Sequence, residues 1–145
     1  ADLDPWVSAF TEWGRQAAGV TALAAVDASW VKWEPRFAGR AREVIEMWLR
    51  VAREWVACPC EAHERAAEAK LPTAPTAFAD EEIPRGGGYI IDAVAAVVRL
   101  AAGVGPLTVR LPIGNARHGP DGRITDEVRR AIGDKVGYWA LYDEH

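Results

Sequence analysis

The sequence has few of the residues that usually supply covalent cross-links or a hydrolase nucleophile. Its two cysteines, Cys58 and Cys60, lie too close together to join distant parts of the chain. Ser8 and Ser29 are the only serines, and neither lies in the G-x-S-x-G motif of the α/β-hydrolases. The phosphate-binding motifs G-x-x-x-x-G-K-[ST] and G-x-G-x-x-G are also absent. No motif in the chain therefore names a reaction.

The chain also lacks an excess of positive charge and a long hydrophobic run. Seventeen basic residues against twenty-one acidic ones give a net charge of −4, which argues against a nucleic-acid partner bound through phosphate contacts. No apolar run is long enough to span a bilayer. The chain begins ADLDPW, with acidic side chains where a secretory signal would be positive. We expect a cytoplasmic protein that binds neither membrane nor nucleic acid.

What the sequence does have is a strongly apolar stretch, YIIDAVAAVVRLAA, at residues 89–102. Fourteen residues between a Gly-Gly-Gly run and Gly103 favour a helix over a strand. This helix is apolar on all sides except at Asp92 and Arg99, so the rest of the chain must enclose it. We expect it to be the central helix of one domain, residues 1–145, because a chain of this length supports one core.

Helical spacing of apolar residues predicts further helices around the central one. They span residues 4–18 and 20–33, divided at Gly19, then 36–57, a polar helix from Glu61, and about eleven residues from Thr125 to an end near Gly137. Alternating apolar residues predict a strand over 107–113. Residues 138–142 fit a second, parallel strand or a last helical turn, and we favour the strand. The predicted fold is mainly α, a bundle of five or six helices with a small C-terminal β element.

Cys58, Cys60 and His63 form the pattern C-x-C-x-x-H, which contains side chains that bind zinc. Structural zinc sites usually have four ligands in paired spacings, and the chain has no second cysteine pair. A cysteine at the start of a helix, with a histidine as base, is an alternative, since the helix terminus would lower the thiol pKa. We expect neither, and predict no metal and no cofactor, because two cysteines at a helix junction are more often buried apolar groups.

Charged residues near the central helix are candidates for binding a ligand. Asp92 and Arg99 lie on one face, seven residues apart, and with tryptophan walls they would form the polar floor of a pocket. Arg85 precedes the glycine run that opens the helix, where backbone N–H groups attract anions. A second basic group, Arg117, His118 and Arg123, would join this anion site if the fold brought the two loops together. The alternative is that these charges meet partners or solvent.

The stretch that comprises the polar helix and the loop after it, residues 58–85, is acidic, and the loop is rich in proline. Residues 58–85 hold six acidic and three basic side chains, and so carry three of the four net negative charges. Within it Phe78 lies beside Asp80, Glu81 and Glu82, an apolar anchor in a charged rim that is typical of a binding hot spot. We expect residues 72–85 to bind a protein partner, and their negative charge favours a basic one. The alternative is a solvated connector.

In general character a small, acidic, helix-rich chain of this kind resembles the bacterial immunity proteins and antitoxins, which neutralise a basic partner enzyme. The resemblance implies a protein-binding inhibitor or adaptor. The alternative function is a small-ligand-binding protein or an enzyme with a pocket at the central helix, formed by the tryptophans, Asp92 and Arg99.

Overall fold

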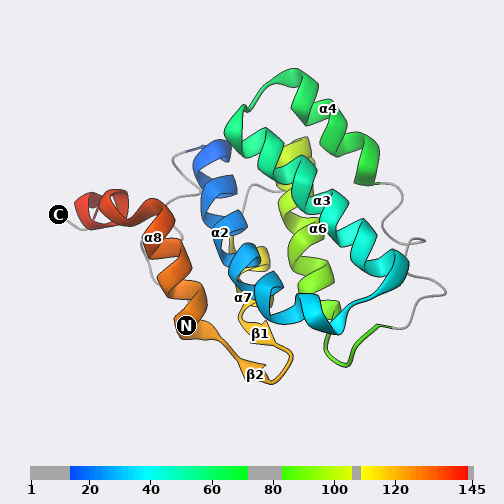
Figure 1. The fold of residues 1–145 in the computed structure, drawn as a ribbon. Helices are drawn as coiled ribbons and strands as arrows, with labels where there is room; N and C mark the ends of the chain where they lie inside the picture. Colours follow the sequence, from blue (N-terminus) through cyan, green and yellow to red (C-terminus); the bar gives the residue numbers. More distant parts are fainter. Residues whose placement is uncertain (1–13, 72–82, 106–108, 144–145) are drawn as a thin grey trace.

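A computed structural model of the chain describes residues 14–71, 83–105 and 109–143, with side chains up to Lys135. Within these residues the chain forms six α-helices, one short 3-10 helix and one hairpin of two short strands (Figure 1). The elements are α2 (Arg15–Trp33), η2 (Glu34–Arg36), α3 (Gly39–Ala57), α4 (Glu61–Lys70), α6 (Gly88–Ala102), α7 (Arg110–Ala116), β1 (His118–Gly119), β2 (Gly122–Arg123) and α8 (Thr125–Asp143). The predicted mainly α fold with a small β element near the C-terminus is confirmed.

The helix at the centre of the bundle is α6, as the sequence predicted. Ten of its fifteen residues are buried, and it contacts α2, α3, α4 and α7 (Figure 1). Gly103 ends it with φ of +73°, a conformation that glycine adopts without steric cost. Its two charged residues, Asp92 and Arg99, are exposed to solvent. The enclosure of α6 is therefore complete except along the stripe that holds these charges.

The predicted helix break at Gly19 is wrong, because α2 runs without interruption from Arg15 to Trp33. Gly14, whose φ is +119°, precedes its first turn. Gly19 is buried instead against Trp55 of α3, so the glycine serves the close approach of two helices rather than a chain turn. The helix lies between α8 and α6 and is buried along much of its length, which gives it a second central position (Figure 1).

The strongest amphipathic pattern in the sequence becomes α3, three residues shorter at its start than predicted. Pro35 lies in the 3-10 turn η2, and Phe37 is extended, so the helix begins only at Gly39. The predicted inner face is buried, with Trp48 and Trp55 at most 2% exposed. Phe37 packs against the rings of Trp30 and Trp33, with centroids 5.5 and 6.1 Å away.

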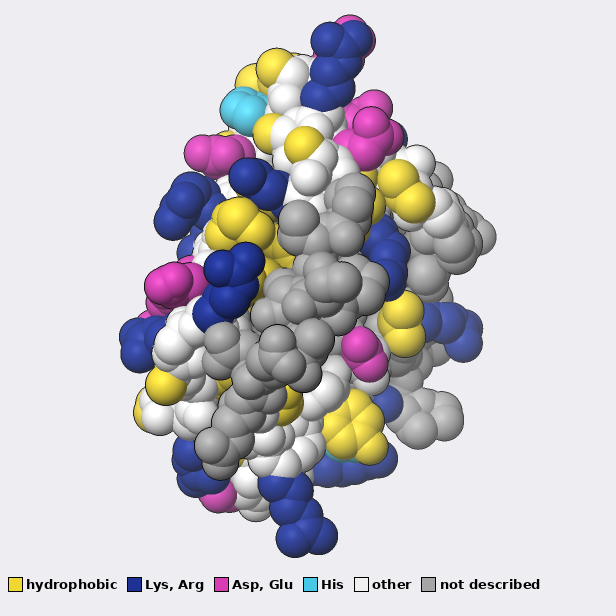
Figure 2. Space-filling model, turned by 90° about the vertical axis from the view of Figure 1, so that its right-hand side faces the viewer, with side chains coloured by type: hydrophobic (Ala, Val, Ile, Leu, Met, Phe, Trp, Pro, Cys, Tyr) yellow, Lys and Arg dark blue, Asp and Glu magenta, His cyan; other side chains and the backbone are white. Residues whose placement is uncertain are grey.

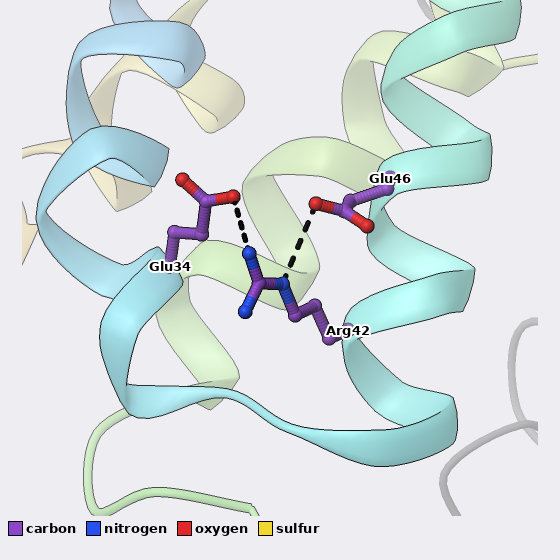
Figure 3. Close-up of polar contacts among 3 residues, drawn as sticks. All are labelled: Glu34, Arg42 and Glu46. Atoms are coloured by element: carbon purple, nitrogen blue, oxygen red, sulfur yellow. Dashed lines mark hydrogen bonds and ion pairs between the residues drawn. The ribbon is translucent and has the colours of Figure 1, made fainter.

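The outer face of α3 begins with a charged group that ties it to η2. Arg42 donates from Nη2 to Glu34 at 2.7 Å and from Nε to Glu46 at 3.4 Å (Figure 3). The second contact joins residues one helical turn apart within α3, and the first joins two elements. All three side chains are about 40% exposed, so solvent screens the attraction and the group positions the turn more than it stabilises the fold.

The predicted strand over 107–113 is wrong where the structure describes it, because residues 110–116 form α7. Pro112 occupies the first turn, where a missing N–H costs no helical hydrogen bond. Val109, Pro112, Ile113 and Ala116 are buried, at helical spacing, whereas Leu111 is 52% exposed. The apolar residues 109, 111 and 113 alternate as they would in a strand. The buried positions instead follow the spacing of a helix.

The C-terminal β element exists, but at other residues than predicted. It is an antiparallel hairpin between α7 and α8, in which His118 pairs with Arg123 and Gly119 with Gly122. Residues 138–142 belong to α8, which continues past Gly137 to Asp143, so the predicted strand and the predicted helix end there are both wrong. Val128 and Ile132 of α8 are buried, and the helix packs against α2.

All the described helices contribute to a single hydrophobic cluster. Its largest fully buried side chains include Trp33, Trp48, Ile45 and Leu49. Among the described residues no helix is both long enough and apolar enough to cross a membrane.

Candidate functional site

Two thiols and an imidazole meet where α3 ends and α4 begins. Pro59 cannot continue α3, whose last residue is Ala57, and Cys60 then takes extended backbone angles as the N-cap residue of α4. The side chain at the third position of the new helix, His63, points back toward the N-cap, as the glutamate of a capping box does. Local geometry therefore brings C-x-C-x-x-H to one place without help from the distant chain.

The distances within this group determine which nitrogen of the His63 imidazole carries a hydrogen. Nδ1 of His63 lies 2.8 Å from the carbonyl oxygen of Cys58. Because a carbonyl oxygen only accepts, Nδ1 must carry the hydrogen and donate it. The same nitrogen lies 3.3 Å from Sγ of Cys60. The potential ligand atoms of Cys58, Cys60 and His63 all lie within 4.8 Å of one another.

The surroundings give the two thiols opposite character. The backbone N–H of His63, facing the sulfur, lowers the pKa of Cys60, and a hydrogen bond from Cys58 and the nearby imidazole lower it further. The side chain of Cys60 makes no capping hydrogen bond, so the N–H of His63 acts on the sulfur through the partial positive charge of its hydrogen. The hydrogen bond with Cys60, and the negative charge that Cys60 carries, raise the pKa of Cys58. Donation to the Cys58 carbonyl raises the pKa of His63. These opposite shifts make Cys60 the more acidic of the two thiols.

These three residues offer an incomplete ligand set for a structural metal. Zinc in structural sites takes four ligands, and among the described residues this is the one group of three or more such side chains. Cys58 is exposed and Cys60 half-buried, rather than the buried apolar groups that we expected. The absence of a metal remains a prediction.

One of the residues predicted to form a pocket at the central helix lies at a surface recess. Arg99, together with Leu100, Val104 and Leu111, lines a recess of about 140 Å³ on the surface between α6 and α7. Asp92 and the tryptophans are not part of its lining. Ligand pockets usually measure about 300–1,000 Å³, so this recess suits a side chain more than a small molecule.

The two basic loops do come together at the start of α6. Tyr89 stacks on the imidazole of His118, with ring centroids 3.9 Å apart and planes 13° from parallel. Trp33 supports the arrangement, since its Nε1 donates to the carbonyl oxygen of His118 at 2.9 Å. Burial, and then the charges of Arg123 and Arg117, lower the pKa of His118. Arg85, four residues before Tyr89 in the chain, is exposed. No feature of the sequence indicated the Tyr89–His118 stack, which depends on tertiary packing.

The residues predicted to bind a protein partner, Phe78, Asp80, Glu81 and Glu82, lie outside the described residues. What the structure does describe of the acidic segment is α4, which holds Glu61, Glu64 and Glu68. The hypothesis about the loop therefore stays a prediction.

Comparisons with protein-family models, with curated proteins and with solved structures find no match for this chain. Any functional assignment therefore rests on the residues and their geometry.

Proposed function

We propose that this protein is a binding module for another protein, an inhibitor or adaptor of the immunity or antitoxin kind. The proposed contact surface is the acidic region at residues 58–85, which comprises α4 and the segment after it. A basic partner would approach it faster at low ionic strength, because opposite charges steer association. We also propose a cytoplasmic location, where reducing conditions keep both cysteines as thiols.

The observation that carries the proposal is how little of α4 is used by the fold. The helix buries Ala67 alone, and packs against α3 and α6 on the outside of the bundle (Figure 1). Glu64 pairs with Arg15 of α2, which attaches the helix to the core. Glu61 and Glu68 are exposed. Figure 2 shows the side of the molecule with α4 in its upper part, where charged side chains of both signs lie beside apolar ones.

The test compares two triple variants of equal net charge. Replacing Asp80, Glu81 and Glu82 by serine removes three acidic groups from the proposed surface. Replacing Glu43, Asp126 and Asp134, which are exposed on α3 and α8, removes three from elsewhere. The second variant should keep the free energy of unfolding within about 0.5 kcal/mol of the parent, because exposed substitutions have small effects. We expect the same of the first variant.

Partners captured from a cell extract are then measured for association rate at several salt concentrations. The first variant should associate more slowly and with a weaker salt dependence, and the second should bind as the parent does. If both variants show the same decrease in association rate, only the total charge of the protein matters and the proposed surface is wrong.

The alternative function, a small-ligand site at the central helix, has one specific observation in its favour, the position of Arg99 beside the recess. An anionic side chain or small acid would pair with its guanidinium. Titration of an anionic ligand library by tryptophan fluorescence, with Asp92→Asn and Arg99→Met variants, tests it. Binding that both variants leave unchanged would remove this alternative.

A further inference from the structure

We propose that Cys58 and Cys60 form a thiol–disulfide exchange pair, in which Cys60 attacks a disulfide of a protein substrate and Cys58 resolves the resulting mixed disulfide. This activity goes beyond protein binding and does not require the acidic segment to bind a partner. It rests on the position of Cys60 at the N-cap of α4, on the contacts of His63, and on the accessibility of both sulfurs.

The position of Cys60 suits an attacking thiolate. The positive end of the α4 dipole and the His63 imidazole both lie beside its sulfur, and each favours the negative charge. Nδ1 of His63 is held by the Cys58 carbonyl, so the imidazole cannot rotate away from the sulfur without losing that hydrogen bond. Cys60 is half-buried rather than enclosed, so a substrate disulfide can reach it.

Cys58 has the properties of the resolving partner. Cys58 is exposed, and its sulfur lies within 4.8 Å of Sγ of Cys60, with Pro59 alone between the two residues. The neighbouring Cys60 raises the pKa of Cys58, whereas the pKa of Cys60 is lowered, so Cys60 is the thiol that ionises first. An exposed disulfide that closes so short a loop is readily reduced again, as catalytic disulfides are.

The reaction balances without a metal or an organic cofactor. The Cys60 thiolate attacks one sulfur of the substrate disulfide, that S–S bond breaks, and the leaving thiolate takes a proton from water. Cys58 then loses its proton to water, and its thiolate attacks the sulfur of Cys60 and releases the second substrate thiolate. Two electrons pass from the dithiol to the substrate, and a low-molecular-weight thiol reduces the new Cys58–Cys60 disulfide.

The experiment uses the full-length reduced protein with oxidised glutathione as the probe, followed by acid quenching and intact-mass spectrometry. The parent should convert to the intramolecular disulfide with little adduct. Cys58→Ser should stop at a stable mixed disulfide with glutathione. Cys60→Ser should react about ten-fold more slowly at pH 7, because its remaining thiol has little thiolate. Insulin replaces glutathione to test a protein disulfide, and the parent but neither variant should reduce it catalytically with dithiothreitol present.

A second measurement needs no substitution. Alkylation of the parent by iodoacetamide, mapped by peptide mass spectrometry over pH, should label Cys60 before Cys58. His63→Gln should move the midpoint of Cys60 labelling to higher pH and leave the far-UV circular dichroism unchanged.

Three outcomes would overturn the proposal: equal labelling of the two thiols, failure of the parent to close the disulfide, or one zinc ion per chain that protects both thiols after purification. The last would also contradict the predicted absence of a metal. None of these measurements involves a protein partner, so their failure leaves the proposed binding function to its own test.

Discussion

Gly19 lies inside α2, although glycine has a low helix propensity, because α2 and α3 approach each other closely at this residue. A Cβ built there would lie 2.9 Å from Cζ3 of Trp55 and 3.3 Å from Cγ2 of Val56. The Trp55 ring is buried and cannot move aside cheaply. Glycine is retained at this position because α2 and α3 approach so closely.

We predict that Gly19→Ala destabilises the protein by about 1 kcal/mol. Overpacking costs about 1–3 kcal/mol and the better helix propensity of alanine returns up to about 1 kcal/mol. Gly133→Ala in α8 is the matched control, because a Cβ there meets nothing within 4 Å. The control should be more stable than the parent by about 0.5–1 kcal/mol in urea unfolding. A Gly19→Ala protein as stable as the control would show that the two helices are not in contact there.

The pKa of His63 is raised and the pKa of His118 is lowered, so the titration of each histidine tests the contacts described around it. We predict by NMR that His63 titrates above 6.5 and His118 below it. The stability that His63 contributes is complete below pH 6.5 and is lost as the pH rises through its folded-state pKa. The stability linked to neutral His118 is complete above pH 6.5 and is lost as the pH falls toward its folded-state pKa.

The His118→Phe variant checks the second half of this prediction. It keeps a ring against Tyr89 and removes the titration, so its urea midpoint should fall less than that of the parent between pH 7 and pH 5. His63→Gln and His118→Phe also assign the NMR signals. Reversed positions for the two histidines would contradict the contacts that we describe around each of them.

The helix α7 is the element for which the sequence pattern and the structure disagree, and two substitutions distinguish them. On a strand Leu111 and Ile113 would share one face and respond alike. On α7 Leu111 is 52% exposed and Ile113 is 1% exposed. We predict that Ile113→Ala costs about 2–5 kcal/mol and Leu111→Ala within about 0.5 kcal/mol of zero, measured by urea unfolding. Similar losses at both positions would favour the strand.

The whole chain should unfold as one unit, since a single cluster joins the described helices. We predict that far-UV circular dichroism and tryptophan fluorescence give coincident urea transitions. Ile132→Val, in the core of α8 and distant in sequence from α2 and α3, should shift both curves together by about 0.5–1.5 kcal/mol. Two separated transitions would contradict the single domain expected from the length of the chain.

The sequence by itself determined the elements whose signals are local and strong. The apolar side chains of α6 leave water only if the rest of the chain surrounds this helix. Those of α3 leave water only if its apolar face packs on the core. Pro59 ends the helical hydrogen-bond pattern between α3 and α4 regardless of the surrounding structure. The group of Cys58, Cys60 and His63 is equally local, because an N-cap residue and the third helical residue always face each other. The spacing of the three residues is visible in the sequence, but the incomplete set of metal ligands and the expectation of buried cysteines argued against a functional site there.

Tertiary structure decided the features whose local signals were weak or balanced. A glycine inside a helix costs only about 1 kcal/mol, so packing against Trp55 keeps α2 continuous through Gly19. The apolar residues of α7 satisfy both a period of two and a helical period, and burial against α6 and α2 selects the helix. The stack of Tyr89 on His118 joins residues far apart in the chain, through contacts that no local period encodes. Local preferences of about 1 kcal/mol determine an element only where the buried surface of the whole fold does not favour another one.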